Sequence, residues 1–175
     1  MGDTLTMALP APNTAAVAFD ALYRSCVDDV HAYAWSLLRD RAAAEDVTAL
    51  AFERAYRKRG RFDPSKGTER AWIFGIARNA ALDELRRRRR TATLVTDPED
   101  PAAAAAVSDS GEAAERRATV QMALATLDPR DRELVALKFH AGLSNAEIAE
   151  VLGVSESNAG TKVHRAVTKL REACA

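Results

Sequence analysis

The 175-residue chain is poor in the residues that build non-helical folds. It has 2 Cys, 8 Gly and 6 Pro, and only 6% of its residues are aromatic. Cys26 and Cys174 lie far apart and share no Cys/His spacing, which argues against a disulfide framework and against a zinc site. Because Ala, Arg, Leu and Val dominate instead, the composition disfavours sandwiches and barrels and predicts an all-α fold.

Long uncharged apolar runs are also missing. Charged residues interrupt the longest apolar stretches, and residues 1–12 contain no basic segment of the kind that begins a signal peptide. We therefore expect no membrane insertion. Two unpaired cysteines fit the reducing cytoplasm, where we expect the protein to work.

No set of residues suggests catalysis. His31, His140 and His164 are scattered, and the acidic pairs Asp28/Asp29 and Glu45/Asp46 have no histidine or glycine-rich loop beside them. We expect no catalytic residue, no metal and no cofactor.

The net charge is zero, with 25 basic and 25 acidic residues, but the charges are segregated. Val17–Arg90 has 16 Lys and Arg against 11 Asp and Glu, and residues 116–175 have nine against seven. Thr91–Glu115 has six acidic residues, no basic residue and two prolines, which is typical of a flexible linker. The chain thus divides into a flexible N-terminus (1–15), a first domain (16–90), an acidic linker (91–112) and a second domain (113–175).

Apolar residues at steps of three and four predict one helix in the first domain from Phe19 to Leu37. Further helices are expected over Ala43–Arg59 and over 68–90, joined by a Gly- and Pro-containing loop, Gly60–Gly67. In the second domain a helix is expected over 113–126, and a short helix ends at Gly153. The residues expected to cap the remaining helices are Asp128 with Pro129, Ser144 with Glu147, and Ser155.

The segment NAEIAEVLGVSESNAGTKVHRAVTKLR (145–171) predicts a helix-turn-helix, since a short helix, a Gly-containing turn and a longer basic helix suit docking in the major groove. Five polar residues fall opposite the apolar face of the last helix and could reach phosphates and bases together. They are Asn158, Thr161, Lys162, Arg165 and Lys169. The alternative is an ordinary solvated helix face.

The helix over 68–90 interleaves aromatic and basic residues and ends in five arginines, a pattern that can follow a phosphate backbone. The arginines Arg86–Arg90 could instead simply suit the negative end of the helix dipole. An aromatic residue in such a helix is more often core than a stacking surface, which favours a core position for Trp72. Asn79 could read a base edge or satisfy a backbone group, and spacing does not separate these.

Three motifs in this order resemble bacterial sigma factors of the extracytoplasmic-function type. They are AEDVTALAFERAY (44–56), ERAWIFGIARNAALDELRRRRR (69–90) and the segment 127–172. The resemblance covers Phe19–Arg90 and Ala113–Glu172. It implies a promoter-specificity subunit whose first domain (region 2) binds the polymerase clamp, melts DNA and captures flipped bases of the minus-ten element. Its second domain (region 4) would read the minus-thirty-five element.

The resemblance also implies site residues and partners. The partners would be core RNA polymerase, through its β′ clamp and β flap, promoter DNA, and an anti-sigma factor. The residues implied for the clamp are Glu45, Asp46, Ala49, Leu50 and Glu53. Those implied for the minus-ten element and melting are Lys66, Gly67, Thr68, Arg70, Trp72, Arg78, Asn79, Asp83, Arg86 and Arg87. Those implied for the minus-thirty-five element are Ser157, Asn158, Thr161, Lys162, His164, Arg165 and Lys169.

The chain departs from the family pattern at two places. Ala49 and Leu50 stand where a Gln and an acidic residue are usual, so the clamp contact is expected to be weaker or built differently. Ala159 and Gly160 stand where a β-branched and a basic residue are usual, which removes a phosphate contact. The rival hypotheses are a dimeric helix-turn-helix regulator that acts without polymerase, and a helical adaptor that binds an acidic protein.

Overall fold

The computed structural model describes residues 14–94 and 111–174, and within these ranges every regular element is a helix. The predicted all-α class is therefore confirmed. The N-terminal segment 1–13 and most of the predicted acidic linker, 95–110, lie outside the described residues.

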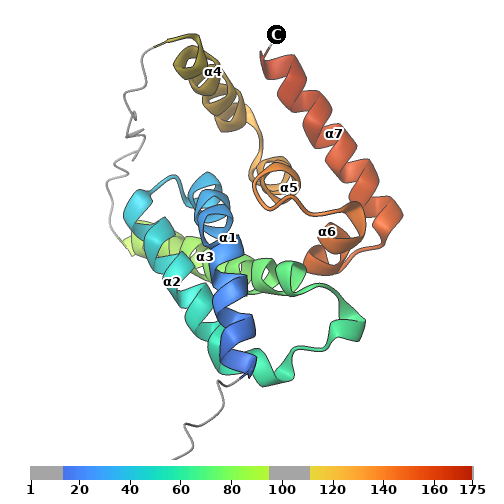
Figure 1. The fold of residues 1–175 in the computed structure, drawn as a ribbon. Coiled ribbons are helices and arrows are strands. Elements are labelled where there is room, and N and C mark those ends of the chain that lie inside the picture. The colour runs from blue at the N-terminus through green and yellow to red at the C-terminus, as the bar shows by residue number, and fades with distance from the viewer. Residues whose placement is uncertain (1–13, 95–110, 175) are drawn as a thin grey trace, which may run out of the picture.

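The first domain consists of α1 (Thr14–Leu38), α2 (Arg41–Lys58) and α3 (Glu69–Leu94), which pack side by side (Figure 1). The Asp40 carboxylate caps α2 by accepting a hydrogen bond from the Ala43 amide at 3.0 Å. The predicted loop between α2 and α3 contains two 3₁₀ turns, Arg59–Arg61 and Pro64–Lys66. Helix α3 runs to Leu94, four residues past the expected end of the first domain at Arg90, because Thr91 and its neighbours carry no helix-breaking residue.

The second domain consists of α4 (Glu112–Thr126), α5 (Pro129–Phe139), α6 (Asn145–Leu152) and α7 (Glu156–Cys174). The caps predicted from the sequence are confirmed. Asp128 accepts hydrogen bonds from two amides of α5, both at 3.0 Å. Ser144 and Glu147 form a capping box at α6, and Gly153 ends that helix with φ 67°, a left-handed conformation that favours glycine.

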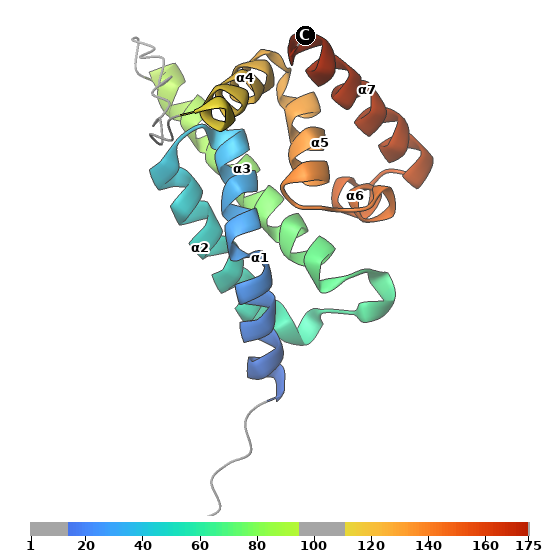
Figure 2. The ribbon, with the colours of Figure 1, turned by 45° about the horizontal axis from the view of Figure 1, so that its top comes forward.

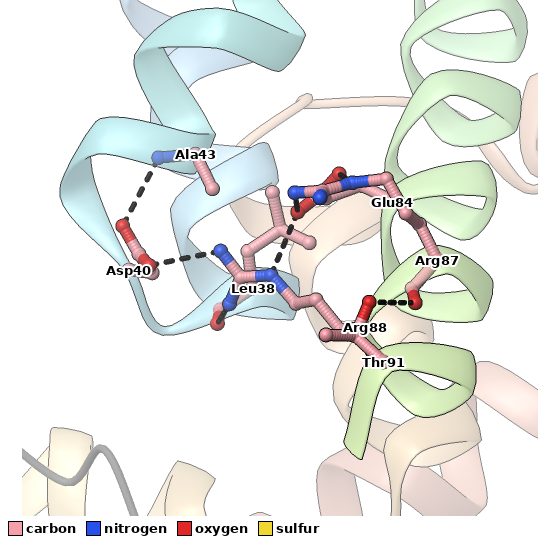
Figure 3. Close-up of polar contacts among 7 residues, drawn as sticks. All are labelled: Leu38, Asp40, Ala43, Glu84, Arg87, Arg88 and Thr91. Carbon is pink, nitrogen blue, oxygen red and sulfur yellow. Dashed lines mark hydrogen bonds and ion pairs between the residues drawn. The ribbon is translucent and has the colours of Figure 1, made fainter. Parts of the chain in front are cut away.

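Small side chains bring the three helices of the first domain close together. One buried cluster of α1, α2 and α3 contains five alanines beside one leucine and one valine: Ala34, Leu38, Ala43, Ala44, Val47, Ala80 and Ala81. At the edge of this cluster Arg88 ties α3 to the turn before α2 (Figure 3). Its guanidinium donates to Asp40 and Glu84, both at 2.8 Å, and to the Leu38 carbonyl at 3.4 Å.

The two domains share a continuous core. Helices α5 and α6 lie against α1 and α3 (Figure 2). Tyr33 and Phe74 of the first domain are fully buried in the same cluster as Leu137, Leu143 and Ile148 of the second. The sequence predicted two domains on a flexible linker but not this contact between them. Apolar periodicity shows which face of a helix is buried, but it does not show which other helix packs against that face.

Candidate nucleic-acid interface

Helices α6 and α7 form the predicted helix-turn-helix. Ala159, Val163 and Ala166 on α7 are buried, and α7 packs against α5 and α6. The predicted polar residues point the other way, and all seven minus-thirty-five candidates are exposed: Ser157, Asn158, Thr161, Lys162, His164, Arg165 and Lys169. One exposed side of α7 therefore carries neutral donors and acceptors together with three cations.

Lys169 differs from its neighbours on that side because α5 holds it. Its ammonium pairs with the Asp131 carboxylate and lies 3.5 Å from that of Asp128. These pairs raise the pKa of Lys169, with the hydrogen bond to Asp131 as the largest cause. Lys169 therefore fixes α7 on the start of α5.

Gly160 lies where α7 passes close to the start of α6. A Cβ atom there would lie 3.2 Å from Nδ2 of Asn145, the first residue of α6. A methyl group at this position would require the Asn145 amide to move by a few tenths of an ångström. The Oδ1 atom of Asn145 is buried there without a hydrogen-bond partner among the described residues.

A cavity of about 440 Å³ opens between the loop after α2, helix α3 and the end of α6. The predicted minus-ten residues Lys66, Gly67, Thr68, Trp72 and Asn79 all line it. So do residues that were not predicted, namely Arg61, Phe62, Asp63, Ala71, Gly75, Ile76, Glu150 and Val151. The structure thus brings the predicted minus-ten residues of the loop after α2 and Asn79 of α3 to one concave surface.

Trp72 is half-buried rather than a full core residue. Its side chain packs against the core on one side and borders the cavity. The centroids of the Trp72 and Phe62 rings are 5.3 Å apart. Phe62 was missed because an isolated aromatic residue in a loop has no periodicity to mark it. The loop itself is fixed by Asp63, which accepts hydrogen bonds from the Ser65 amide and hydroxyl at 3.0 and 2.7 Å. These bonds lower the pKa of Asp63.

Three of the minus-ten candidates contact the second domain. The Thr68 hydroxyl donates to Glu147 at 2.6 Å, and Arg70 donates to the Ala141 carbonyl at 2.6 Å. Arg78 pairs with the buried Glu133 at 2.6 Å. Glu133 also accepts from the Tyr33 hydroxyl, and burial raises the pKa of Tyr33 well above its usual value. In the sequence, the only sign of this contact is that the Glu133 carboxylate lies among apolar residues of the helix over 129–139.

The arginine run at the end of α3 is mostly paired within its own helix. Arg86 contacts Asp83 at 3.2 Å, while Arg87 contacts Glu84 at 2.7 Å. The Arg87 bond is the largest cause that lowers the pKa of Glu84 to about 2. Arg86 and Arg87 are exposed, whereas Arg88 is half-buried and structural.

The predicted clamp residues form one exposed side of α2: Glu45, Asp46, Ala49, Leu50 and Glu53 are all exposed. Leu50 is 36% exposed, which is high for a leucine. A shallow groove of about 500 Å³ runs beside it, and Asp46, Leu50, Asp83 and Arg87 are among its lining residues. This face has an apolar centre with charges of both signs around it.

In the part of the chain that the structure describes, no group of three His, Cys, Asp or Glu side chains lies close enough to hold a metal ion. Among the same residues, no helix has the length and apolar character needed to cross a membrane.

These features define a two-domain helical protein with a helix-turn-helix in the second domain and an aromatic-lined cavity at its boundary with the first. Family models agree, since Sigma-70 region 2 matches residues 22–91 and Sigma-70 region 4 matches residues 117–170. The chain is 34% identical to the RNA polymerase sigma factor CarQ of Myxococcus xanthus over 89% of this chain and 88% of CarQ. It is 32% identical to the ECF RNA polymerase sigma factor SigL of Mycobacterium tuberculosis over 90% of this chain and 91% of SigL.

Among solved structures, the sigma factor RpoE in complex with the anti-sigma factor NepR from Bartonella quintana matches with a TM-score of 0.73 and 25% identity. The match covers 89% of this chain and 96% of RpoE. The chain belongs to the sigma-70 family, as a sigma factor of the extracytoplasmic-function type. Its function is to bind RNA polymerase and to recognise promoters, and sigma factors are non-enzymatic regulators.

Proposed function

We propose that the exposed side of α7 reads the minus-thirty-five element from the major groove, with Arg165 as the main base contact. Arginine can donate two hydrogen bonds to one guanine, and this is the commonest specific contact in the major groove. Thr161, Lys162 and His164 lie on the same exposed helix and would hold phosphates and bases beside it. The buried side of α7 keeps this array rigid.

The minus-ten element is captured as a single strand in the cavity between the loop after α2 and α3. The observation that carries this proposal is the shape and lining of that cavity. Trp72 and Phe62 offer aromatic surface for an unstacked base, Asn79 offers an amide for its edge, and Lys66 offers a cation for its phosphate. Arg86 and Arg87 lie exposed further along α3, where they can contact the backbone of the melting duplex.

The exposed side of α2 binds the β′ clamp of polymerase through Glu45, Asp46 and Glu53 around Leu50, while the second domain meets the β flap. Leu50 and Ala49 make this contact more apolar than the usual family pattern. In functional terms the chain divides into region 2 (16–90), an acidic linker (91–112) and region 4 (113–175). It acts in the cytoplasm, without catalysis or a cofactor.

An anti-sigma factor is a further proposed partner. The solved relatives include RpoE in complex with NepR and CnrH in complex with the cytosolic domain of CnrY. By analogy, a protein of that kind would hold this chain away from polymerase.

The first experiment is transcription from a pool of genomic promoters by purified core polymerase, with and without this chain. We expect selective initiation, and a loss of at least tenfold with Arg165→Ala. Arg171→Ala, which removes the same charge from an exposed position nearer the end of α7, should leave initiation unchanged. A chain that neither binds polymerase nor initiates would favour the rival regulator that acts alone.

The second experiment tests the cavity. A single-stranded minus-ten oligonucleotide is titrated into the complex of this chain with core polymerase, and Asn79→Ala is compared with the wild type. We expect weaker binding, with reduced discrimination at one base position only. Equal loss at every position would show that Asn79 contacts no base edge.

A further inference from the structure

Apolar packing holds the start of helix α7 more firmly than its end. The buried side chains of α7 are Ala159, Val163 and Ala166, which are small and all precede its last two turns. Beyond them, Val167 and Leu170 are only half-buried. The angle at which the end of α7 lies on the domain therefore depends on other contacts.

Lys169 makes the polar contact that holds this end of α7 on α5. Its ammonium donates to the Asp131 carboxylate and lies 3.5 Å from that of Asp128, the N-cap of α5. The Lys169 side chain is 55% exposed, whereas that of Asp131 is only 14% exposed. The cation thus reaches back from the exposed side of α7 to a carboxylate that is mostly buried.

The two carboxylates depend on this cation. Asp128 accepts a hydrogen bond from the Asp131 amide at 3.0 Å, so the two acidic residues lie close together at the start of α5. This bond is the largest cause that lowers the pKa of Asp128, and the charge of Lys169 also lowers it. Like charges at this spacing repel unless a cation lies beside them. A lysine that moved to a DNA phosphate would leave that repulsion uncompensated.

The start of α5 is itself fixed, because the next residue ties it to α4. Arg132 donates to the carbonyls of Leu124, Ala125 and Leu127 at 2.9, 3.1 and 2.9 Å. These bonds satisfy carbonyl groups that have no partner within the last turn of α4. The turn between α4 and α5 is thus a rigid base to which Lys169 joins α7.

The proposed base contact lies directly beside this anchor. Arg165 precedes Lys169 by one turn on the same exposed side of α7. Four residues of helix rise by about 6 Å, so a tilt at the end of α7 also moves the Arg165 guanidinium. A guanidinium that donates two bonds to one guanine has to be held within about 0.5 Å of the productive geometry. The angle of α7 therefore decides whether that contact forms.

We propose that Lys169 is a positioning residue of the promoter-reading helix and not a DNA contact: with Asp131 and Asp128 it fixes the angle of α7 on the turn between α4 and α5. This proposal rests on the groove-reading role proposed above for α7. The Lys169 ammonium stays on the two carboxylates in the complex with DNA, and Arg165 depends on it for its orientation. Spacing along α7 suggested a DNA contact at this position, because it does not show that α5 offers a partner.

A charge exchange tests the proposal in the complete holoenzyme of core polymerase with this chain. The single variant K169D brings three carboxylates together, and we expect promoter-specific initiation to fall by about tenfold. The double variant D131K/K169D again has one ammonium between two carboxylates, so initiation should return to within about threefold of the wild type. A lysine that contacts DNA cannot be rescued in this way, because the double variant carries a carboxylate at position 169. No recovery in the double variant would overturn the proposal.

Two further variants are the controls for this exchange. Arg171→Asp makes the same change of charge at an exposed position beyond Lys169, and it should alter initiation by less than about twofold. Arg165→Ala, measured in parallel, tests the role of α7 itself. Full initiation by Arg165→Ala would refute the groove-reading role and the proposal with it. Loss with Arg165→Ala but no rescue by the exchange would refute the positioning role of Lys169 alone.

The salt dependence of promoter binding by the holoenzyme is a second readout, which uses no exchanged charges. Each phosphate contact contributes about 0.9 to the slope of log affinity against log salt concentration. K162M removes a proposed phosphate contact and should reduce this slope by about that amount. K169M should keep the wild-type slope but lose discrimination between the minus-thirty-five sequence and a scrambled one. A slope that falls as far for K169M as for K162M would show Lys169 on a phosphate and contradict the proposal.

Discussion

Arg78 on α3 and Glu133 on α5 form an ion pair of 2.6 Å across the boundary between the two domains, with side chains only 24% and 12% exposed. The Tyr33 hydroxyl on α1 donates to the same carboxylate at 3.4 Å. One acidic side chain of region 4 is thus held by two helices of region 2, which makes it the polar centre of the boundary.

Removal of this carboxylate should destabilise the folded chain. Glu133→Ala leaves Arg78 and the Tyr33 hydroxyl without their partner in a mostly buried site, and we expect a loss of about 2 kcal/mol in the free energy of unfolding. Urea unfolding measures it. The exposed pair Arg24–Asp20 provides the control, since Asp20→Ala should cost less than about 1 kcal/mol. Equal effects of the two changes would mean that the boundary is open in solution.

Arg88 should matter more for stability than the arginine at the end of the run. Arg88→Ala removes the bonds to Asp40, Glu84 and the Leu38 carbonyl, and we expect a loss of about 1 to 2 kcal/mol. Arg90→Ala removes an exposed side chain and should change stability by less than about 0.5 kcal/mol. Thermal unfolding of both variants separates the structural arginine from the exposed one.

The stability of the chain should fall in acid partly because of Glu84. Its pKa is lowered from 4.5 to about 2, chiefly by the hydrogen bond from Arg87. Because the folded form binds the proton more weakly than the unfolded form, Glu84 stabilises the fold above pH 4.5, and this contribution disappears as the pH falls towards 2.

Glu84→Gln should therefore show a smaller decrease in unfolding free energy between pH 4.5 and pH 2 than the wild type does. Denaturant unfolding at several pH values measures the difference. Glu172→Gln, at an exposed position, serves as the control and should follow the wild type. If the unfolding free energies of Glu84→Gln and the wild type changed with pH in parallel, folding would not lower the pKa of Glu84.

Gly160→Ala should stabilise α7, because Ala is favoured over Gly in a helix interior by about 1 kcal/mol. The new Cβ atom would lie 3.2 Å from Nδ2 of Asn145, the end of a side chain that can move by a few tenths of an ångström. We expect a net gain of about 0.5 kcal/mol, measured by thermal unfolding. A loss instead would mean that the contact between α6 and α7 is rigid.

The sequence predicted the helix-turn-helix well because its signals are local. Asp128, Ser144 and Gly153 each act on amides or carbonyls within a few residues, so the sequence alone contains both partners. Contacts between the domains were not predictable in this way. Arg78 and Glu133 are 55 residues apart, and the sequence of neither helix indicates that the two side chains pair. Trp72 shows the same limit, since periodicity does not reveal that one side of the ring borders a cavity.

The division of α7 into two sides has a consequence for how such proteins diverge. Its packing depends on Ala159, Val163 and Ala166, while the polar residues on the other side are exposed, and exposed substitutions usually change stability by less than about 0.5 kcal/mol. Apart from Lys169, which pairs with Asp131 on α5, mutation can therefore alter the exposed side without loss of the fold. A duplicated gene could acquire a new set of target promoters through a few changes on one helix, and keep the rest of the molecule intact.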